Sequence, residues 1–360
     1  MKLVVFGLTV TSSWGNGHAT LWRSLIRALA RRGHAVTFFE RDVPWYANAR
    51  DAFDIPGLTV VAYPDWQAAL PQARAALRGA DAAMVTSYCA DGVAASDLVL
   101  GEGRGARVFY DLDTPVTLDL LAGGKPPDWL PPQGLSGFDL VLSYTGGEAL
   151  ARLRTELGAR RVAPLYGSVD PDAHRPAEPV AAYRADLSYL GTYAADRQVA
   201  LERLFVEPAR RRPGGRFVIG GAQYPQDFPW TPNIHFVRHM PPPEHPAFFS
   251  SSRLTLNVTR RAMAALGWCP SGRLFEAAAC GTPVLSDAWD GLDHFYAPGE
   301  EILVARDTAD ALAALDLPEA EIRRIARRAR DRTLAEHAGD RRAAELEAAL
   351  EGIRAPVMEG

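Results

Sequence analysis

Residues 253–287 read RLTLNVTRRAMAALGWCPSGRLFEAAACGTPVLSD and contain one strand–helix–strand unit. An apolar run of β type begins at Arg253, and a second one begins at Pro283. Between them, Ser271 is suited to cap a helix that begins at Gly272, because a serine hydroxyl accepts a hydrogen bond from a first-turn amide. Apolar strands that alternate with helices indicate a parallel sheet with both faces covered.

The same alternation continues over the second half of the chain. The expected strands are LSYLG from Leu187, RFVIGG from Arg216, IHFV from Ile234, RLTLNV from Arg253, PVLSD from Pro283 and EILVA from Glu301. The tail that follows is rich in Ala, Glu and Arg at helical spacing. We therefore predict an α/β domain over residues 187–335 and a C-terminal helix over residues 336–360.

The first half of the chain shows a similar series. Its expected strands are LVVFGL from Leu3, AVTFF from Ala35, LTVV from Leu58, AAMVTS from Ala82, RVFY from Arg107 and FDLVLS from Phe138. Three prolines in a polar stretch, Pro171, Pro176 and Pro179, then interrupt regular structure. We predict a doubly wound N-terminal domain over residues 1–168 and a linker over residues 169–186.

Composition limits the classes of function. A chain of 360 residues suggests two domains, and 48% hydrophobic with 23% charged residues is typical of a globular protein. The net charge of -4 shows no basic excess, so nucleic acid is not an expected partner. The arginine-rich run over residues 323–332 is interpreted as a solvated helix face.

The number of cysteines and the length of the apolar runs indicate in which cellular compartment the protein is expected. Cys89, Cys269 and Cys280 are too few and too unevenly spaced for a disulfide framework or a four-cysteine zinc site. The N-terminal run MKLVVFGL is too short for the core of a signal peptide, and no stretch of about 18 apolar residues occurs. We expect a soluble cytoplasmic protein without a transmembrane segment.

The loop after the first strand, TVTSSWGNGHAT, is a candidate ligand loop, because ligands of open parallel sheets bind beyond the carboxyl ends of the strands. Gly15 and Gly17 allow the backbone to approach a ligand closely. His18 falls near the helix start, where it bonds either to the ligand or simply to solvent or backbone.

A dinucleotide-binding alternative rests on Gly15, Gly17 and Glu40, which have about the spacing of that fingerprint. Several residues separate the strand end at Leu8 from Gly15, and no third glycine opens the helix. The pattern therefore favours another ligand over a nicotinamide cofactor.

The loop after the strand at Arg253 carries more positive charge. A helix that starts at Gly272 presents free amides to an anion. Arg273 in its first turn opposes the helix dipole by roughly 0.3–1 kcal/mol, which a bound anion would compensate. Arg260 follows the preceding strand and adds to the same charge. A diphosphate fits this arrangement, and solvated arginines are the alternative.

The segment SGRLFEAAACGTPVLSD from Ser271 resembles the donor-binding region of the CgeB-like, spore-maturation type of GT-B glycosyltransferase, which is related to retaining enzymes such as glycogen synthase. The resemblance extends to YLGTY from Tyr189, FVIGGAQYPQDFPW from Phe217 and HMPPPEHPAFF from His239, and covers nearly the whole chain. It implies two Rossmann-like domains that face each other across a cleft, with the N-terminal domain on the acceptor side.

This resemblance also implies transfer of a hexosyl group from a nucleoside-diphosphate sugar to an unknown small molecule, glycan or protein. Neither a further cofactor nor a metal is expected, because helix ends and basic side chains neutralise the leaving diphosphate. The expected donor-binding residues are Gly191, Asn257, Arg260, Ser271, Gly272, Arg273 and Glu276.

Glu276 lies one helical turn after Gly272, on the face shared with Arg273. Its side chain points toward the helix N-terminus, so we expect it to hydrogen-bond the ribose of the donor. A glutamate on the helix surface is the alternative reading.

Many retaining relatives carry two glutamates eight positions apart. The second of the two corresponds to Glu276, and at the position of the first this chain has Trp268. The candidate catalytic residues are therefore His18 and Asp113, although Asp113 and the nearby Asp111 also suit a turn-capping role. An inverting enzyme with His18 or an aspartate as base is one alternative. The other is a protein without transferase activity that binds sugar-nucleotides or is associated with a coat.

Overall fold

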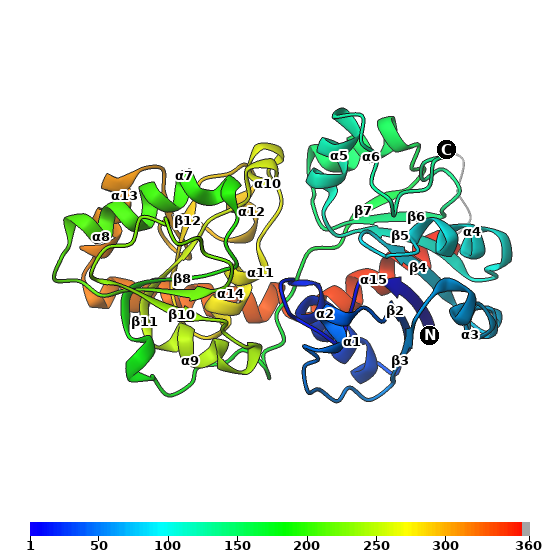
Figure 1. Cartoon of the computed structure of the whole chain (residues 1–360), viewed down its shortest axis with the longest axis horizontal. Helices are drawn as coiled ribbons and strands as arrows, with labels where there is room; N and C mark the ends of the chain where they lie inside the picture. Colours follow the sequence, from blue (N-terminus) through cyan, green and yellow to red (C-terminus); the bar gives the residue numbers. More distant parts are fainter. Residues whose placement is uncertain (355–360) are drawn as a thin grey trace. The chain divides into compact units, whose positions relative to one another are not determined.

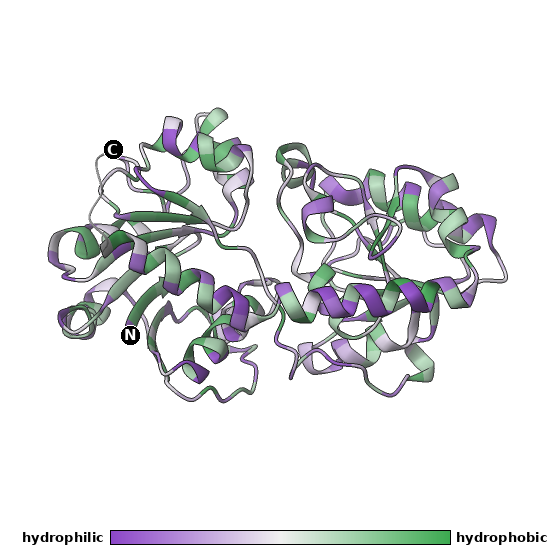
Figure 2. Ribbon diagram, turned by 180° about the vertical axis from the view of Figure 1, so that it is seen from behind, coloured by the Kyte–Doolittle hydropathy of each residue, from purple (hydrophilic) through white to green (hydrophobic). Residues whose placement is uncertain are grey.

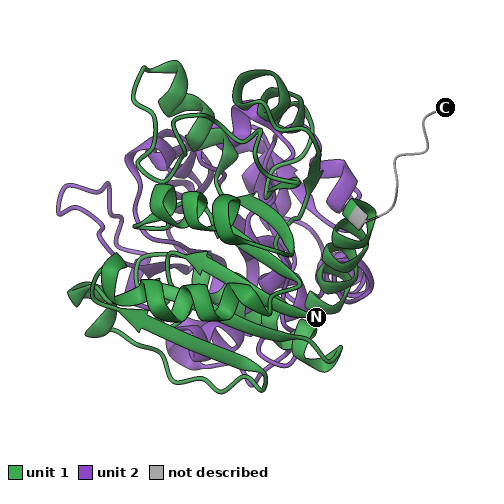
Figure 3. Cartoon of the chain, turned by 90° about the vertical axis from the view of Figure 1, so that its right-hand side faces the viewer, with its two compact units in different colours: residues 1–167, 339–360 green, residues 168–338 purple. Residues whose placement is uncertain are grey.

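The computed structural model describes residues 1–354 and divides the chain into two compact units (Figures 1 and 3). Unit 1 comprises residues 1–167 together with the C-terminal segment that begins at Gly339, and unit 2 comprises residues 168–338. Each unit contains one parallel sheet with helices on both faces. The α/β fold class expected from the alternating pattern is confirmed.

Unit 1 has a seven-stranded parallel sheet in the order β3-β2-β1-β4-β5-β6-β7. Its strands are β1 (Lys2–Gly7), β2 (Ala35–Arg41), β3 (Leu58–Tyr63), β4 (Ala82–Thr86), β5 (Ala106–Asp111), β6 (Leu140–Ser143) and β7 (Val162–Pro164). Leu3 of β1 pairs with Val36 on one side and with Ala82 on the other. The strand order reverses between β1 and β4, which is where open α/β sheets form their ligand crevice.

The sheet of unit 1 packs a separate core on each face. The helices are α1 (His18–Arg31), α2 (Pro44–Ala47), α3 (Trp66–Arg78), α4 (Gly92–Glu102), α5 (Thr114–Ala122), α6 (Glu148–Leu157) and α15 (Gly339–Arg354). Val5 of β1 packs in the core that contains Trp22, whereas the adjacent Phe6 packs in the core with Phe39. Successive strand residues face opposite sides of a sheet, so one strand supplies both cores.

Helix α15 returns the chain to unit 1. Its buried side chains Ala343, Leu346 and Leu350 belong to the same core cluster as Trp22 of α1. Gly339 permits the approach, because a Cβ there would lie 2.7 Å from the Ser24 carbonyl oxygen.

Unit 2 has a six-stranded parallel sheet in the order β10-β9-β8-β11-β12-β13. Its strands are β8 (Ala185–Leu190), β9 (Phe217–Gly221), β10 (Ile234–Arg238), β11 (Ser252–Asn257), β12 (Val284–Asp287) and β13 (Leu303–Ala305). All six coincide with strands expected from the sequence. The order again reverses next to the first strand, between β8 and β11, so unit 2 has the same doubly wound topology as unit 1.

Apart from α14 (Glu319–Glu336), the described α-helices of unit 2 are at most eight residues long. The shorter helices are α7 (Gln198–Leu201), α8 (Glu207–Arg211), α9 (His245–Ser250), α10 (Arg261–Leu266), α11 (Gly272–Ala279), α12 (Leu292–Phe295) and α13 (Thr308–Leu315). Figure 2 shows hydrophobic residues along the strands and hydrophilic ones on the outer helices. On α14, Arg324 pairs with Glu321 and Arg328 with Glu300, as expected of a solvated basic face.

The boundaries of the units differ from the predicted domains in two places. The expected linker, residues 169–186, belongs to unit 2, where Val169 donates to the His337 carbonyl and Val180 donates to the Ser251 hydroxyl. The prolines predicted no regular structure there, but the backbone bonds to neighbouring elements, and β8 already begins at Ala185. The expected C-terminal helix, residues 336–360, begins instead at Gly339, and residues 355–360 lie outside the described part of the chain.

Two findings bear on the expected compartment. Cys89, Cys269 and Cys280 are buried and form no disulfide within the described residues. Between residues 1 and 354, no helix combines the length and the apolar character that crossing a bilayer requires.

The packing of α15 leads to a stability prediction. Leu346 is 1% exposed in the core of unit 1, so Leu346→Ala should lower the free energy of unfolding by about 2–5 kcal/mol through lost burial and a cavity. Urea denaturation monitors this loss. Val199→Ala is the control, because Val199 is 76% exposed and its truncation should change stability by less than about 0.5 kcal/mol. A Leu346→Ala protein as stable as the control would contradict the described packing.

Candidate functional site

The first turn of α11 is arranged as the sequence predicts. Ser271 is the N-cap residue, and its hydroxyl accepts a hydrogen bond from the Arg273 amide at 3.3 Å. Gly272 is the first helical residue, and a Cβ built there would meet no atom within 4 Å. The turn follows β11 and precedes β12, and the space beside Gly272 lets a ligand approach the backbone.

Arg273 and Glu276 form an ion pair within this helix. The Arg273 guanidinium donates to the Glu276 carboxylate three residues later, and Glu276 is only 5% exposed. Burial by itself would raise the pKa of Glu276, but the positive charge of Arg273 outweighs it and lowers the pKa to about 2. Glu276 is therefore not a surface glutamate, and Arg273 already has an anionic partner within the chain.

Arg260 lies at the N-terminus of α10 and faces a different loop. Its Nε donates to an Asp196 carboxylate oxygen at 3.3 Å, and its side chain remains 41% exposed. Asp196 lies in the loop after β8, the loop that also contains Gly191. A partly exposed guanidinium with one surface partner can exchange that partner for a phosphate at small cost.

Gly191 and Asn257 have internal roles. A Cβ at Gly191 would lie 2.9 Å from the Tyr189 hydroxyl, and the Gly191 amide donates to the Gly220 carbonyl. Asn257 is 4% exposed, and its amide nitrogen donates to the Ser286 hydroxyl at 3.1 Å. Asn257 thus ties the end of β11 to β12.

Trp268 occupies a strained position before α11. Its φ of 51° is in the left-handed region, which costs energy for a residue with a Cβ. The indole packs against the His294 ring at 5.0 Å between centroids, and against Gly291, where a Cβ would lie 2.6 Å from the ring. The side chain at position 268 is therefore an aromatic ring that packs against His294 and Gly291, and not a carboxylate.

In unit 1, the loop after β1 is held by Glu40. The Glu40 carboxylate accepts from the Val10 amide at 2.6 Å and the Thr11 amide at 3.2 Å. In a dinucleotide-binding site an acidic residue at this place would bind the ribose, whereas the Glu40 carboxylate here is already bonded to backbone amides. Gly15 has a φ of 69°, and no atom lies within 4 Å of a Cβ built at Gly15 or Gly17, so this loop can approach a ligand closely.

Tyr88 links the two candidate catalytic residues of unit 1. The His18 ring packs edge-on against Tyr88 at 5.3 Å between centroids, and the Tyr88 hydroxyl donates to an Asp113 carboxylate oxygen at 2.9 Å. Burial lowers the pKa of His18 to about 4, so the imidazole is neutral at pH 7. His18 follows β1, Tyr88 follows β4 and Asp113 follows β5, so they meet at the reversal of strand order.

Sequence reasoning missed Tyr88. Its φ of 63° marks a strained backbone of the kind that collects at functional sites, but no local sequence signal gives this value. The only signal was its position just beyond an expected strand. Asp113 is the N-cap residue of α5, although its side chain makes no capping hydrogen bond.

Asp111 is not in contact with solvent beside His18 and Tyr88 but is buried under the Asp113 backbone. The residue is fully buried, and one carboxylate oxygen accepts from the Asp113 amide at 3.1 Å. Burial raises the pKa of Asp111 to about 6. Its role is to shape the turn that presents Asp113.

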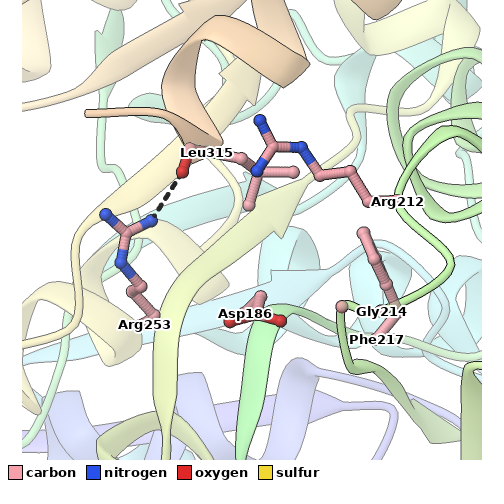
Figure 4. Close-up of a pocket in the computed structure, with 7 residues that line it drawn as sticks. Asp186, Arg212, Gly214, Phe217, Arg253 and Leu315 are labelled. Atoms are coloured by element: carbon pink, nitrogen blue, oxygen red, sulfur yellow. Dashed lines mark hydrogen bonds between the residues drawn. The ribbon is translucent and has the colours of Figure 1, made fainter. Parts of the chain in front are cut away.

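A pocket of about 350 Å³ lies elsewhere in unit 2 (Figure 4). Asp186, Phe217 and Arg253 line it from the amino ends of β8, β9 and β11. Arg253 donates to the Leu315 carbonyl at 2.9 Å. Because this is the edge opposite the expected ligand loops, the pocket is not part of the candidate site.

Comparisons with known proteins identify the fold. A sucrose-phosphate synthase from Thermosynechococcus elongatus is similar with a TM-score of 0.71 and 16% identity, over 98% of this chain and 99% of its own. Anabaena HepE in complex with UDP-glucose has a TM-score of 0.67 and 10% identity, over 98% and 100%. The E. coli trehalose-6-phosphate protein bound to UDP-2-fluoro glucose has a TM-score of 0.61 and 12% identity, over 98% and 99%. The chain has the GT-B glycosyltransferase fold.

More narrowly, residues 197–348 match the protein family described as glycosyl transferase-like. This match includes α10, α11 and all the expected donor-binding residues except Gly191. No curated protein matches the sequence. The glycosyltransferase class expected from the sequence is confirmed at the level of this domain and of the fold, and the CgeB-like subfamily remains a prediction.

The buried carboxyl of Asp111 gives a pH-dependent prediction. Its pKa of about 6 in the folded chain exceeds the value near 4 of an unfolded carboxyl, so the stability that its proton contributes is present below about pH 4 and is lost as the pH rises through 6. Asp111→Asn stays neutral, so its stability relative to wild type should be about 1–2 kcal/mol more favourable at pH 8 than at pH 5. Urea denaturation at both pH values measures this difference. Asp119→Asn, an exposed control, should show none.

Proposed function

We propose that the protein is a glycosyltransferase that moves a hexosyl group from a nucleoside-diphosphate sugar to an acceptor hydroxyl. The observation that carries this proposal is the first turn of α11, with its capped and accessible amides beside Arg273, inside the glycosyl transferase-like domain. The similar solved structures bound to UDP-glucose and UDP-2-fluoro glucose suggest a UDP-sugar as the donor.

In this proposal, the diphosphate lies against the first turn of α11 at Gly272, where a Cβ would meet no atom, while the Arg273 amide stays bonded to the Ser271 hydroxyl. Arg273 turns from Glu276 to the phosphates, and Arg260 exchanges Asp196 for the same anion. Donors fixed in this way stabilise the charge that develops on the leaving group, so the reaction needs no metal at the diphosphate.

The departure of Arg273 leaves the Glu276 carboxylate free to accept hydrogen bonds from the ribose hydroxyls. Glu276 lies one turn below the phosphates, and its side chain points toward the helix N-terminus. Gly191 and Asn257 support the same site through the backbone of the loop after β8 and through the anchored end of β11.

For the acceptor, we assign His18 and Asp113 of unit 1 as the residues that bind and orient the attacking hydroxyl, with Tyr88 holding Asp113. We propose retention at the anomeric carbon, on the resemblance to retaining enzymes. If the reaction inverts instead, the neutral His18 or Asp113 is the base. The anomeric configuration of the product, read by NMR, decides between these two.

One observation favours a second function, a sugar-nucleotide binder that transfers no sugar. Many retaining relatives have a glutamate at the position of Trp268, whereas this chain has an indole that packs against His294. Release of UDP from UDP-glucose, with and without candidate acceptors, tests this alternative. Tight binding without any turnover would support it.

We also propose that the protein acts in the cytoplasm. Three buried cysteines without a disulfide among the described residues fit a reducing compartment.

Arg260→Ala and Arg273→Ala test the phosphate contacts. Each should weaken UDP binding about 10- to 100-fold and uridine binding less than about threefold, because a charge-assisted hydrogen bond is worth about 1.5–3 kcal/mol and uridine lacks that partner. Calorimetric titration gives both affinities. Arg323→Ala on α14 is the control, since Arg323 is 64% exposed on another helix. Equal losses for UDP and uridine would show that these arginines act only on the fold.

Glu276→Gln tests the ribose contact. Wild-type protein should prefer UDP over 2′,3′-dideoxy-UDP by about tenfold, because a hydrogen bond to a carboxylate is worth about 1.5–3 kcal/mol. The variant should lose most of this preference. A preference that survives in Glu276→Gln would refute the assignment, whatever the variant does to overall affinity.

A further inference from the structure

Three buried side chains of unit 2, one of them on α11, lie close together. His174 comes from the segment before β8, His245 is the first residue of α9, and Glu276 belongs to α11. Their exposed fractions are 7%, 3% and 5%. One potential metal-binding atom from each residue lies within 4.8 Å of the other two.

The hydrogen bonds of this group are incomplete. His245 Nε2 lies 3.3 Å from the Met240 carbonyl and therefore donates to it, which leaves Nδ1 with a free electron pair. This Nδ1 lies 3.9 Å from Glu276 Oε2, and His174 Nε2 lies 4.0 Å from Glu276 Oε1. Within residues 1–354, neither ring nitrogen of His174 nor the Nδ1 of His245 has a hydrogen-bond partner.

Such an arrangement is costly without a further group. His245 donates through Nε2 to the Met240 carbonyl, so the electron pair of its Nδ1 faces the Glu276 carboxylate with no proton between them. Buried polar atoms without partners destabilise the folded state, because they lose their hydrogen bonds to water and gain none in the protein.

We propose that His174, His245 and Glu276 form a binding site for a divalent transition-metal ion, with zinc as the best fit. Two imidazoles and one carboxylate are a donor set that zinc accepts, and water would complete its coordination. The bond from His245 Nε2 to a backbone carbonyl is the kind that orients a metal-binding histidine.

The distances suit this ion after a small adjustment. Zinc binds histidine nitrogen and carboxylate oxygen at about 2.0–2.2 Å, which places ligand atoms about 3.3–3.6 Å apart. The two histidine–carboxylate separations, 3.9 Å to Glu276 Oε2 and 4.0 Å to Glu276 Oε1, exceed this range by about half an ångström. The three ligand atoms as a set lie within 4.8 Å of one another and would have to move closer together. Rotations of the side chains can supply that movement without a shift of the three backbones.

The charges permit a cation as well. Arg273 shares the Glu276 carboxylate, but its side chain is 33% exposed and can leave for solvent or for an anion. The Asp170 carboxylate lies close enough to raise the pKa of His174, although burial lowers it more, and it adds negative charge on that side. A bound ion would cross-link the 168–184 segment, α9 and α11, and would release Arg273. One Glu276 oxygen is enough for the ion, so the other carboxylate oxygen stays available for the ribose contact of the proposed function.

Metal binding to the full-length chain tests this proposal. Protein stripped with a chelator, and free of any affinity tag, should take up one equivalent of Zn²⁺ in calorimetric titration and should melt at a higher temperature with Zn²⁺ than without it. His174→Ala and His245→Ala should each reduce the affinity at least 100-fold. His235→Ala is the matched control, because His235 is an exposed histidine on β10 and its loss should change nothing.

A measurement on wild-type protein guards against variants that fail to fold. Co²⁺ in the same site should give the intense visible absorption of a four-coordinate centre, and Zn²⁺ should displace it. Absence of stoichiometric metal binding, or full binding by the His174→Ala/His245→Ala double variant, would overturn the proposal. The titrations contain no nucleotide, so their failure would leave the proposed glycosyltransferase function untouched.

Discussion

The constraint on which both units depend is the burial of a parallel sheet on its two faces. Each strand hydrogen-bonds along its edges and projects apolar side chains above and below, so helices have to cover both sides. In unit 1 this requirement reaches the end of the chain, because α15 completes the layer that α1 begins. With the faces closed, only the loops at the strand ends remain open to a ligand. Open α/β sheets bind ligands at the carboxyl ends where the strand order reverses, and the candidate residues of each unit lie in or after the loops at that edge.

Buried charge is the second theme of the structure. Glu40, Asp111 and Glu276 are each nearly or fully inaccessible to solvent, and each is treated differently. Glu40 accepts backbone hydrogen bonds and fixes the loop after β1. Asp111 has a raised pKa because burial dominates, whereas Glu276 has a lowered one because the charge of Arg273 outweighs burial. The balance between desolvation and a nearby opposite charge thus separates an acid that shapes a turn from one that is kept ionised beside a helix N-terminus.

The sequence predicted the strands and the capped start of α11 because those signals are local. Alternating apolar runs, a serine before a glycine and the spacing of Gly272, Arg273 and Glu276 all act within a few residues. The same local reasoning placed a linker over residues 169–186, because prolines and polar residues there disfavour regular structure. It could not show that this segment bonds to His337 and Ser251, since those partners lie far away in the chain. It also explained Arg273 by a bound anion, when Glu276 already supplies a negative charge.

The sequence by itself therefore determined the α/β class, the two Rossmann-like series and the helix N-terminus at Gly272, because short-range periodicity and capping are written in neighbouring residues. Only the tertiary structure decided that Tyr88 joins His18 to Asp113, that α15 completes unit 1, and that His174 and His245 enclose Glu276. These contacts join residues from separate strands and helices. Which of them meet depends on how the sheet orders its strands and how the helices pack on it, and no spacing along the chain carries that information.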